Sequence, residues 1–260
     1  MEDVILERDG PIAIIRINRP ERRNALTGQT VTGLLEAVVD AGEDPEVRVL
    51  VFTGTGDDAF CSGADMKAAS ASAASGRPAR PRGPLSGSQR YLFEAVLETW
   101  KPTIAALNGA AVAGGCELAL ACDIRIAAEH VRFGLPEAKR GMGAHFATVM
   151  LPRMIPSGVA FEMLYRGTYL AAEEALRWGL VNHLTPKGGA LDAALELARE
   201  LVENAPITLR RIKETSVRAS GQPIAAALRL NEGISPYESE DRKEGFRAFV
   251  EKRKPVWQGR

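Results

Sequence analysis

The feature that most constrains this chain is the alternation of short strand-like runs with segments of helical spacing along its first two thirds. Residues 4–8 and 12–17 are rich in β-branched and other apolar residues and flank Asp9-Gly10, a pair typical of a tight hairpin turn. Thr27 then stands at the N-cap position of a segment whose apolar residues recur at helical spacing. The order strand, strand, helix recurs, and it predicts an α/β fold.

The last third of the chain shows mainly helical spacing, with few strand-like runs between the helical segments. Residues 68–84, by contrast, are small, polar, proline-rich and basic, which favours a mobile loop over a packed element. No change in composition marks a boundary between domains, and the helical end of the chain could pack on a partner subunit. Helical spacing covers residues 159–166, 171–178, 190–204 and 239–253.

Charge and composition argue against several classes of function. The 33 lysines and arginines equal the 33 aspartates and glutamates, so no net field draws the protein to nucleic acid or to an anionic membrane. The acidic start MEDVILERDG differs from a signal peptide, and no run has the apolar length of a membrane span, so we expect a cytoplasmic protein. Cys61, Cys116 and Cys122 lack paired spacing and predict neither disulfides nor a zinc site.

Two glycine-rich runs are candidates for binding a ligand through the main chain. Residues 60–67 (FCSGADMK) place small residues where a backbone can be approached closely. In residues 108–117 (NGAAVAGGCE) a glycine pair opens a predicted helix, so free N–H groups and the positive end of the helix dipole face whatever lies in front. Two such donors converging on one carbonyl oxygen would form an oxyanion hole. Each run taken singly fits a turn glycine or a close helix contact equally well.

Two glutamates stand out, although each has an ordinary structural interpretation. Glu117 is embedded in a helix whose neighbouring residues leave almost no polar face, so it is either a first-turn acid that stabilises the helix dipole or a working group in a cleft. Glu137 follows a strand-like run and Pro136, a setting typical of an acid in the first turn of a helix. Only their combination with the glycine-rich runs favours a catalytic site.

Three motifs occur together in one order: FCSGADMK at residues 60–67, NGAAVAGGCELALACD at 108–123 and RFGLPEAKRG at 132–141. In this joint pattern the sequence resembles the crotonase (enoyl-CoA hydratase/isomerase) family. The resemblance extends from residues 18–26 (NRPERRNAL) to residues 249–255 and therefore covers nearly the whole chain.

The resemblance implies a fold and an assembly. It implies a spiral of repeated β-β-α units over residues 1–200, which would hold the CoA and acyl site. Residues 201–260 would form a helical region that packs against neighbouring subunits in a homotrimer, or in a hexamer made of two trimers.

The resemblance also implies a chemistry. In the family, two main-chain N–H groups hold the thioester carbonyl and stabilise an enolate, and the motifs put these donors at Ala64 and Gly114. A glutamate at both Glu117 and Glu137 matches the hydratases and favours hydration of a 2-enoyl-CoA, or the reverse dehydration, over isomerisation. We expect Glu117 mainly to activate the water and Glu137 mainly to protonate the α-carbon.

The same resemblance implies how CoA is bound. The backbone around Asp65, Met66 and Lys67 would contact the adenine, and Arg22 and Arg23 would meet the phosphates, although solvated surface arginines are an alternative for both. CoA enters as part of an acyl-CoA thioester substrate, and no metal or redox cofactor is required. The expected contacts are completed by Ala25, Gly115 and Pro136.

One stretch departs from the hydratase pattern. After Glu137 the glycine-rich segment usual in the family is replaced by residues 139–148 (KRGMGAHFAT). His145 in this stretch could reach the acyl pocket, but a lone histidine beside Phe146 is more often a packing or hydrogen-bonded residue. The departure keeps two alternatives open: another reaction through the same enolate, as in an isomerase, decarboxylase or thioesterase, or an acyl-CoA-binding protein without turnover.

Overall fold

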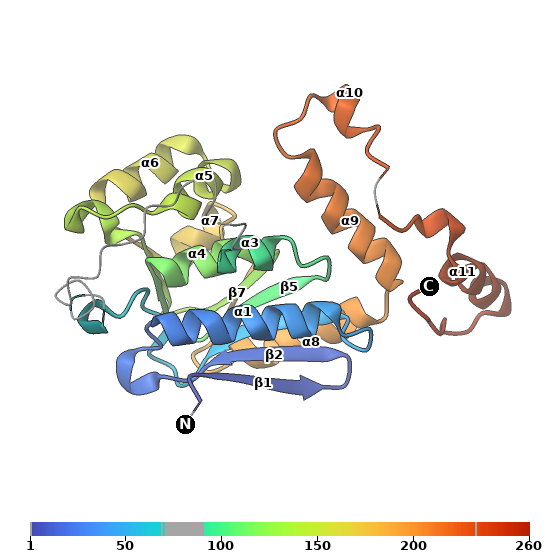
Figure 1. The fold of residues 1–260 in the computed structure, drawn as a ribbon, viewed down its shortest axis with the longest axis horizontal. Coiled ribbons are helices and arrows are strands. Elements are labelled where there is room, and N and C mark those ends of the chain that lie inside the picture. The colour runs from blue at the N-terminus through green and yellow to red at the C-terminus, as the bar shows by residue number, and fades with distance from the viewer. Residues whose placement is uncertain (1, 69, 71–90, 232) are drawn as a thin grey trace, which may run out of the picture.

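The fold is built around two β-sheets, seen in a computed structural model that describes residues 2–68, 70, 91–231 and 233–260 (Figure 1). The larger sheet has the strand order β1-β2-β3-β5-β7-β10. Its first two strands form the antiparallel hairpin expected around Asp9-Gly10, and the remaining neighbours pair in parallel. The strands are β1 (Val4–Asp9), β2 (Ile12–Ile17), β3 (Val49–Gly54), β5 (Thr103–Leu107), β7 (Ile124–Ala128) and β10 (His183–Thr185).

The smaller sheet has the order β4-β6-β8-β9, with β9 antiparallel to β8. Each of β4, β6 and β8 is the next described strand after one of the larger sheet, so in the described residues the chain passes from the larger sheet to the smaller one three times. The predicted recurrence of two strands and a helix, and with it the α/β fold, is therefore confirmed. The strands are β4 (Ala59–Cys61), β6 (Ala110–Val112), β8 (Arg132–Gly134) and β9 (Tyr169–Ala171).

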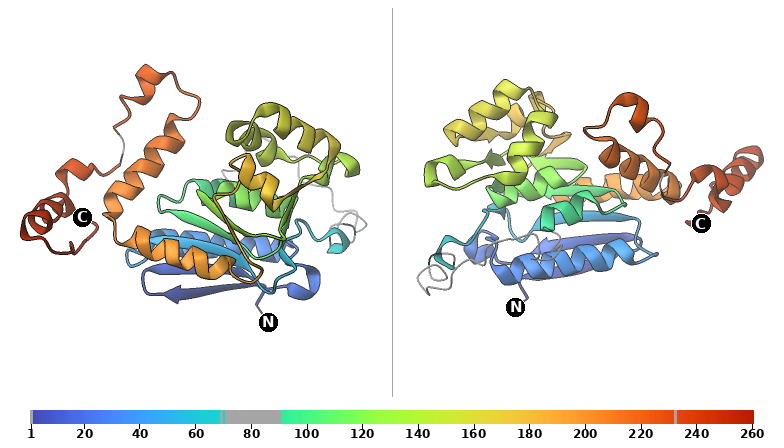
Figure 2. Two further views of the ribbon diagram at one scale, coloured as in Figure 1. Left: turned by 180° about the vertical axis from the view of Figure 1, so that it is seen from behind. Right: turned by 45° about the horizontal axis from the view of Figure 1, so that its top comes forward.

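Helices cover both faces of the larger sheet, and Figure 2 shows α8 on the face opposite α1. Because successive side chains of a strand point to opposite faces, Ile15 packs in the cluster with α1, whereas Ile14 packs with α8. The helices in the described residues are α1 (Gly28–Glu43), α3 (Leu92–Leu97), α4 (Gly114–Ala121), α5 (His145–Met154), α6 (Ser157–Arg166), α7 (Ala172–Arg177), α8 (Ala190–Val202), α9 (Pro206–Ala219), α10 (Ile224–Ala227) and α11 (Glu240–Glu251), with 3₁₀ turns η1 (Pro20–Arg22), η2 (Pro136–Arg140) and η3 (Pro236–Glu238).

The last helices leave the sheets: α9 runs away from them and α11 lies apart (Figure 1). One buried contact fixes the start of this segment, because Nζ of Lys213 lies 2.8 Å from Oδ2 of Asp123 and donates to Oγ1 of Thr103. The division at residue 200 into a core and an oligomerisation region stays a prediction. Several large apolar side chains on this segment are exposed: Ile224, Leu228, Tyr237, Phe246, Phe249, Val250 and Val256.

Two expectations from the sequence concern other parts of the chain. The predicted loop at residues 68–84 lies outside the described residues, apart from Ala68 and Ser70. Within the part of the chain that the structure describes, no helix combines the length and the apolar character needed to cross a bilayer.

Candidate active site

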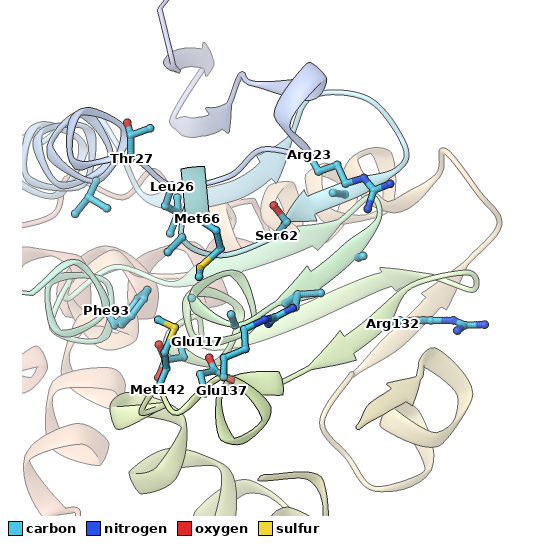
Figure 3. A pocket seen from close by; sticks show the side chains of 18 of the residues that line it. Arg23, Leu26, Thr27, Ser62, Met66, Phe93, Glu117, Arg132, Glu137 and Met142 are labelled. Atoms are coloured by element: carbon cyan, nitrogen blue, oxygen red, sulfur yellow. The ribbon is translucent and has the colours of Figure 1, made fainter. Parts of the chain in front are cut away.

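A cavity of about 890 Å³ opens between the two glycine-rich segments and the turn that carries Glu137 (Figure 3). It brings together half of the residues predicted from the sequence, from four separate parts of the chain. Those that line it are Arg23, Ala64, Met66, Gly114, Glu117 and Glu137. The other predicted residues do not line it, although each is adjacent in sequence to a lining residue: Arg22, Ala25, Asp65, Lys67, Gly115 and Pro136.

Ala64 presents its main-chain N–H at a short contact between two loops. Leu26 donates its N–H to the carbonyl of Gly63 at 2.8 Å, and Asp65 donates its N–H to the carbonyl of Leu26 at 2.9 Å. These two bonds bracket Ala64, and no acceptor among the described residues takes its N–H. The N–H of Ala64 is therefore available to a ligand in the cavity.

Gly114 presents a second N–H at the first residue of α4, where a helix has no internal acceptor for it. The turn into α4 is sharp, since Ala113 has φ 53° and ψ −126°, a backbone conformation that is costly for a residue with a side chain. A Cβ on Gly63 would lie 2.6 Å from Cβ of Ala113 and 3.1 Å from N of Gly114. The loops that carry the two free amides are thus in direct contact.

Gly115 has a different role from that of its neighbour. A Cβ at this position would lie 2.1 Å from the carbonyl oxygen of Cys61, so α4 packs directly on β4 through this glycine. Gly115 therefore brings the two segments of the site together without lining the cavity.

Glu117 lies in the first turn of α4 and is buried. Its Oε1 accepts a 3.0 Å hydrogen bond from the N–H of Ala147 in the first turn of α5. Burial raises the pKa of the Glu117 carboxyl, while the bond from Ala147 opposes that rise and the nearby Glu137 adds to it. The side chain is a buried acid with one donor that stabilises its ionised form.

Glu137 projects from η2 and is also buried. Its Oε2 has no hydrogen-bond partner in the described part of the protein. Burial raises the pKa of this carboxyl as well, while the residue's own main-chain N–H and, more weakly, Arg140 oppose that rise. Figure 3 shows Glu117 and Glu137 side by side at the bottom of the cavity. Two buried carboxyls with unequal donors can hold a proton on one and a charge on the other.

The residues expected to bind CoA differ in their exposure and in whether they already have a partner within the protein. The carboxylate of Asp65 accepts from the N–H of Lys67 at 3.2 Å, and Nε of Arg22 lies 3.8 Å from its Oδ2. Arg23 is exposed at the rim of the cavity and has φ 50°, while Met66 is half exposed. Of the two predicted phosphate-binding arginines, Arg22 is thus near a carboxylate, whereas Arg23 forms no ion pair with another described residue.

Several lining residues were not predicted from the sequence. Phe93, from α3, packs against Phe146 with ring centroids 5.5 Å apart, and Met142 lies nearby in the cavity wall. Apolar residues of this kind carry no motif, so only the fold shows that they line a site. His145, considered as a pocket residue, begins α5, is exposed and does not line the cavity. The unpredicted polar lining residues include Asp58, Arg132, Arg140 and Tyr169.

No cluster of three or more histidine, cysteine, aspartate or glutamate side chains that could hold a metal ion occurs in residues 2–68, 70, 91–231 and 233–260. All three cysteines are buried, and burial raises the pKa of each thiol.

Comparison with known proteins gives one consistent group. The family model described as Enoyl-CoA hydratase/isomerase matches residues 7–260. A carnitinyl-CoA dehydratase of Salmonella paratyphi C is 41% identical over 266 residues, covering 100% of this chain and 99% of the relative. The crystal structure of enoyl-CoA hydratase from Mycobacterium tuberculosis superposes with a TM-score of 0.88 at 36% identity, covering all of both chains. That of enoyl-CoA hydratase from Bacillus anthracis superposes with a TM-score of 0.87 at 30% identity, covering 99% and 100%.

Proposed function

The chain belongs to the enoyl-CoA hydratase/isomerase (crotonase) family, and on that premise we propose that it is a hydro-lyase that adds water to 2-enoyl-CoA thioesters or removes it from 3-hydroxyacyl-CoA thioesters. The observation that carries the proposal is the pair of buried carboxyls, Glu117 and Glu137, at the bottom of a cavity with two free main-chain N–H groups in its wall. An acid-base pair and an oxyanion hole are the two parts that such a reaction needs.

In the proposed mechanism the N–H groups of Ala64 and Gly114 donate to the thioester oxygen. As the water oxygen bonds to the β-carbon, the electron pair of the double bond moves toward the thioester and negative charge develops on its oxygen. Each donor that meets this charge contributes roughly 2.7–4 kcal/mol to the stability of the transition state, judged from the loss of a single donor in other enzymes.

Glu117 accepts the proton that the water loses, and Glu137 delivers a proton to the α-carbon as the enolate collapses. The unequal hydrogen bonding of the two groups supports this division. Burial raises the pKa of both carboxyls, but the N–H of Ala147 stabilises the ionised form of Glu117, as a base requires. For Glu137 the rise in pKa is opposed by the residue's own main-chain N–H, and its Oε2 has no donor among the described residues. Proton exchange between the carboxyls, or with solvent, restores the starting state.

The replaced segment after Glu137 does not remove the support for hydration. Residues 139–148 pass from η2 into α5, and the N–H of Ala147 at the end of this segment holds Glu117. The segment therefore still supplies a main-chain donor to the proposed base.

A second candidate is dehydration of an acyl-CoA whose acyl group carries a quaternary ammonium. It is favoured by the 41% identity, over the whole chain, to a protein named carnitinyl-CoA dehydratase. The aromatic ring of Phe93 in the cavity wall is compatible with such a cation, because aromatic faces attract quaternary ammonium groups. Both candidates use the same two glutamates and differ only in the acyl group.

The test is to follow the loss of the conjugated enoyl-thioester absorbance with crotonyl-CoA, with longer 2-enoyl-CoAs and with crotonobetainyl-CoA, and to identify each product by mass. Gain of one water on any of them supports the proposal, and the ratio of kcat/KM values assigns the acyl group. A shifted double bond, loss of carbon dioxide or free CoA would replace hydration by isomerase, decarboxylase or thioesterase activity. Tight binding with no product would favour an acyl-CoA-binding protein.

The proposal extends to cofactors and assembly. We expect full activity without added metal or redox cofactor, since CoA arrives on the substrate, and dialysis against a chelator checks this. We also propose a homotrimer or a hexamer of two trimers in the cytoplasm, supported by the exposed apolar side chains of residues 224–256. Sedimentation velocity that gives a monomer, or cell fractionation that puts the protein in the membrane, would contradict these statements.

A further inference from the structure

The direction of the Ala64 N–H depends on how two loops are held together. Among the described residues, three main-chain bonds join these loops: the two that bracket Ala64, from Leu26 to Gly63 and from Asp65 to Leu26, and a third from Ser62 to Arg23. Three main-chain bonds in a short bridge are a weak constraint, because each contributes only about 0.5–1.5 kcal/mol net. A further group is needed to keep an amide fixed while charge develops on its acceptor.

Arg19 supplies that constraint, because its guanidinium bonds three segments at once. One terminal nitrogen donates to the carbonyl of Ala25 on the Leu26 side, and the other donates to Oδ2 of Asp65 on the Ala64 side at 3.2 Å. The Nε lies 3.4 Å from Oδ2 of Asp3, and that oxygen also accepts from Oγ1 of Thr30 in the first turn of α1.

The surroundings make this arrangement rigid. The side chain of Arg19 is 13% exposed and that of Asp65 is 7% exposed, so water screens the pair only in part. Oδ1 of Asp65 accepts from the N–H groups of Lys67 and Ala68, each at 3.2 Å. The N–H of Ala68, followed by Arg19, holds the pKa of Asp65 below its ordinary value, so the carboxylate stays charged.

Resting on the proposed function, we propose that Arg19 is a positioning residue of the oxyanion hole: it clamps Ala25 to Asp65 across the Leu26–Ala64 bridge and so keeps the N–H of Ala64 directed at the thioester oxygen. Arg19 does not line the cavity and touches no reacting atom. The planar fork of arginine suits this task, since lysine has a single nitrogen and cannot bond both Ala25 and Asp65 in the same geometry.

The test compares Arg19→Gln and Arg19→Lys with the matched control Arg16→Gln. Arg16 also pairs with a carboxylate through two nitrogens, to Glu7 at 3.0 and 3.2 Å, but it lies in β2 and bonds neither Ala25 nor Asp65. We expect Arg19→Gln to lower kcat for 2-enoyl-CoA hydration roughly 10- to 100-fold, the loss typical of a displaced catalytic group, with a smaller change in KM. Arg19→Lys should recover part of the loss, and Arg16→Gln should leave kcat within about twofold, as a change outside the site should.

A second readout does not depend on water addition. Acetoacetyl-CoA forms an enolate that absorbs in the near ultraviolet, and the fraction of bound ligand in that form at fixed pH reports the strength of the oxyanion hole. Arg19→Gln should reduce this fraction relative to wild type and to Arg16→Gln. If wild type forms the bound enolate but hydrates no enoyl-CoA, the proposed hydratase function is wrong. The enolate fraction of Arg19→Gln still tests the positioning role of Arg19 in that case.

Three results would overturn the role of Arg19. An unchanged enolate fraction in Arg19→Gln would show that Arg19 does not position the oxyanion hole. A rise in KM with kcat unchanged would assign Arg19 to substrate binding instead. Equal losses of urea midpoint and of kcat in Arg19→Gln and Arg16→Gln would reduce it to a general contribution to stability.

Discussion

Oε1 of Glu117 accepts a 3.0 Å hydrogen bond from the N–H of Ala147, so a carboxylate carried by one helix lies at the N-terminal end of another. The free N–H groups and the dipole of α5 favour negative charge at this position, whereas burial disfavours it. The contact therefore keeps a buried acid able to act as a base.

Replacing either proposed catalytic glutamate with glutamine should abolish most of the hydration activity. Glu117→Gln and Glu137→Gln keep the shape of the side chain but cannot exchange a proton, so we expect a loss in kcat of roughly 10²- to 10⁴-fold for each. Steady-state hydration of crotonyl-CoA measures the effect. The control is Glu162→Gln in the exposed pair with Arg166 on α6, which should retain wild-type kcat. Turnover retained in both variants would remove the glutamates from the mechanism.

The buried glutamate at position 137 should reduce stability at neutral and alkaline pH. Burial raises its pKa above the ordinary value of 4.5, so the folded protein prefers the protonated form. The stabilisation that comes with protonation is complete below the unfolded pKa and is lost as pH rises through the folded one. We therefore expect Glu137→Gln to have a higher Tm than wild type at pH 8, and the difference to disappear near pH 4. Thermal unfolding across that range measures it; a lower Tm of the variant at pH 8 would contradict the sign.

The adjacent glycines at the start of α4 should respond differently to alanine. In Gly115→Ala the new Cβ would meet the carbonyl of Cys61 at 2.1 Å, so α4 must move from β4 at a cost of roughly 1–3 kcal/mol or more. In Gly114→Ala the nearest atom is Cδ1 of Leu26 at 3.4 Å, an ordinary contact. Urea unfolding should show a large loss of stability for the first variant and little for the second. Equal losses would contradict the close packing of α4 on β4.

The buried lysine that anchors α9 should contribute far more to the free energy of unfolding than an exposed lysine with a similar ion-pair distance. Lys213 is 6% exposed and lies 2.8 Å from Asp123, whereas Lys254 is 84% exposed and lies 2.7 Å from Glu203. Breaking a buried pair typically costs about 3–5 kcal/mol, with less expected here because Asp123 is partly exposed, and breaking a surface pair about 0–1 kcal/mol. Urea unfolding of Lys213→Met and Lys254→Met measures both, and similar midpoints would contradict the anchor.

Much of the fold could be predicted from the sequence, because the signals for its elements are local. The β-rich composition of β1 and β2, the helical spacing of the apolar residues in α1, the turn at Asp9-Gly10 and the N-cap at Thr27 are properties of neighbouring residues, and the structure confirms them. The family was also predicted, from three motifs in one order, and the comparisons confirm it.

The residues of the candidate site could be predicted less well than the fold from local sequence signals. By the chemistry of their neighbours alone, Glu117 and Glu137 were each compatible with an ordinary helix acid, and their catalytic roles remain predictions that follow from the family resemblance. The sequence likewise carried no signal for Phe93, whose place in the cavity wall depends on how α3 packs.

What the sequence by itself determined, then, is the succession of strands and helices and the family, since both depend on residues close together or in a shared order. The tertiary structure alone decided that Ala147, 30 positions beyond Glu117, holds that carboxylate and that Arg19 reaches Asp65, 46 positions away. The physical reason is that burial, raised carboxyl pKa values and clamps between loops arise from contacts between distant segments. Such contacts exist only once the two sheets have formed and α5 has packed against α4.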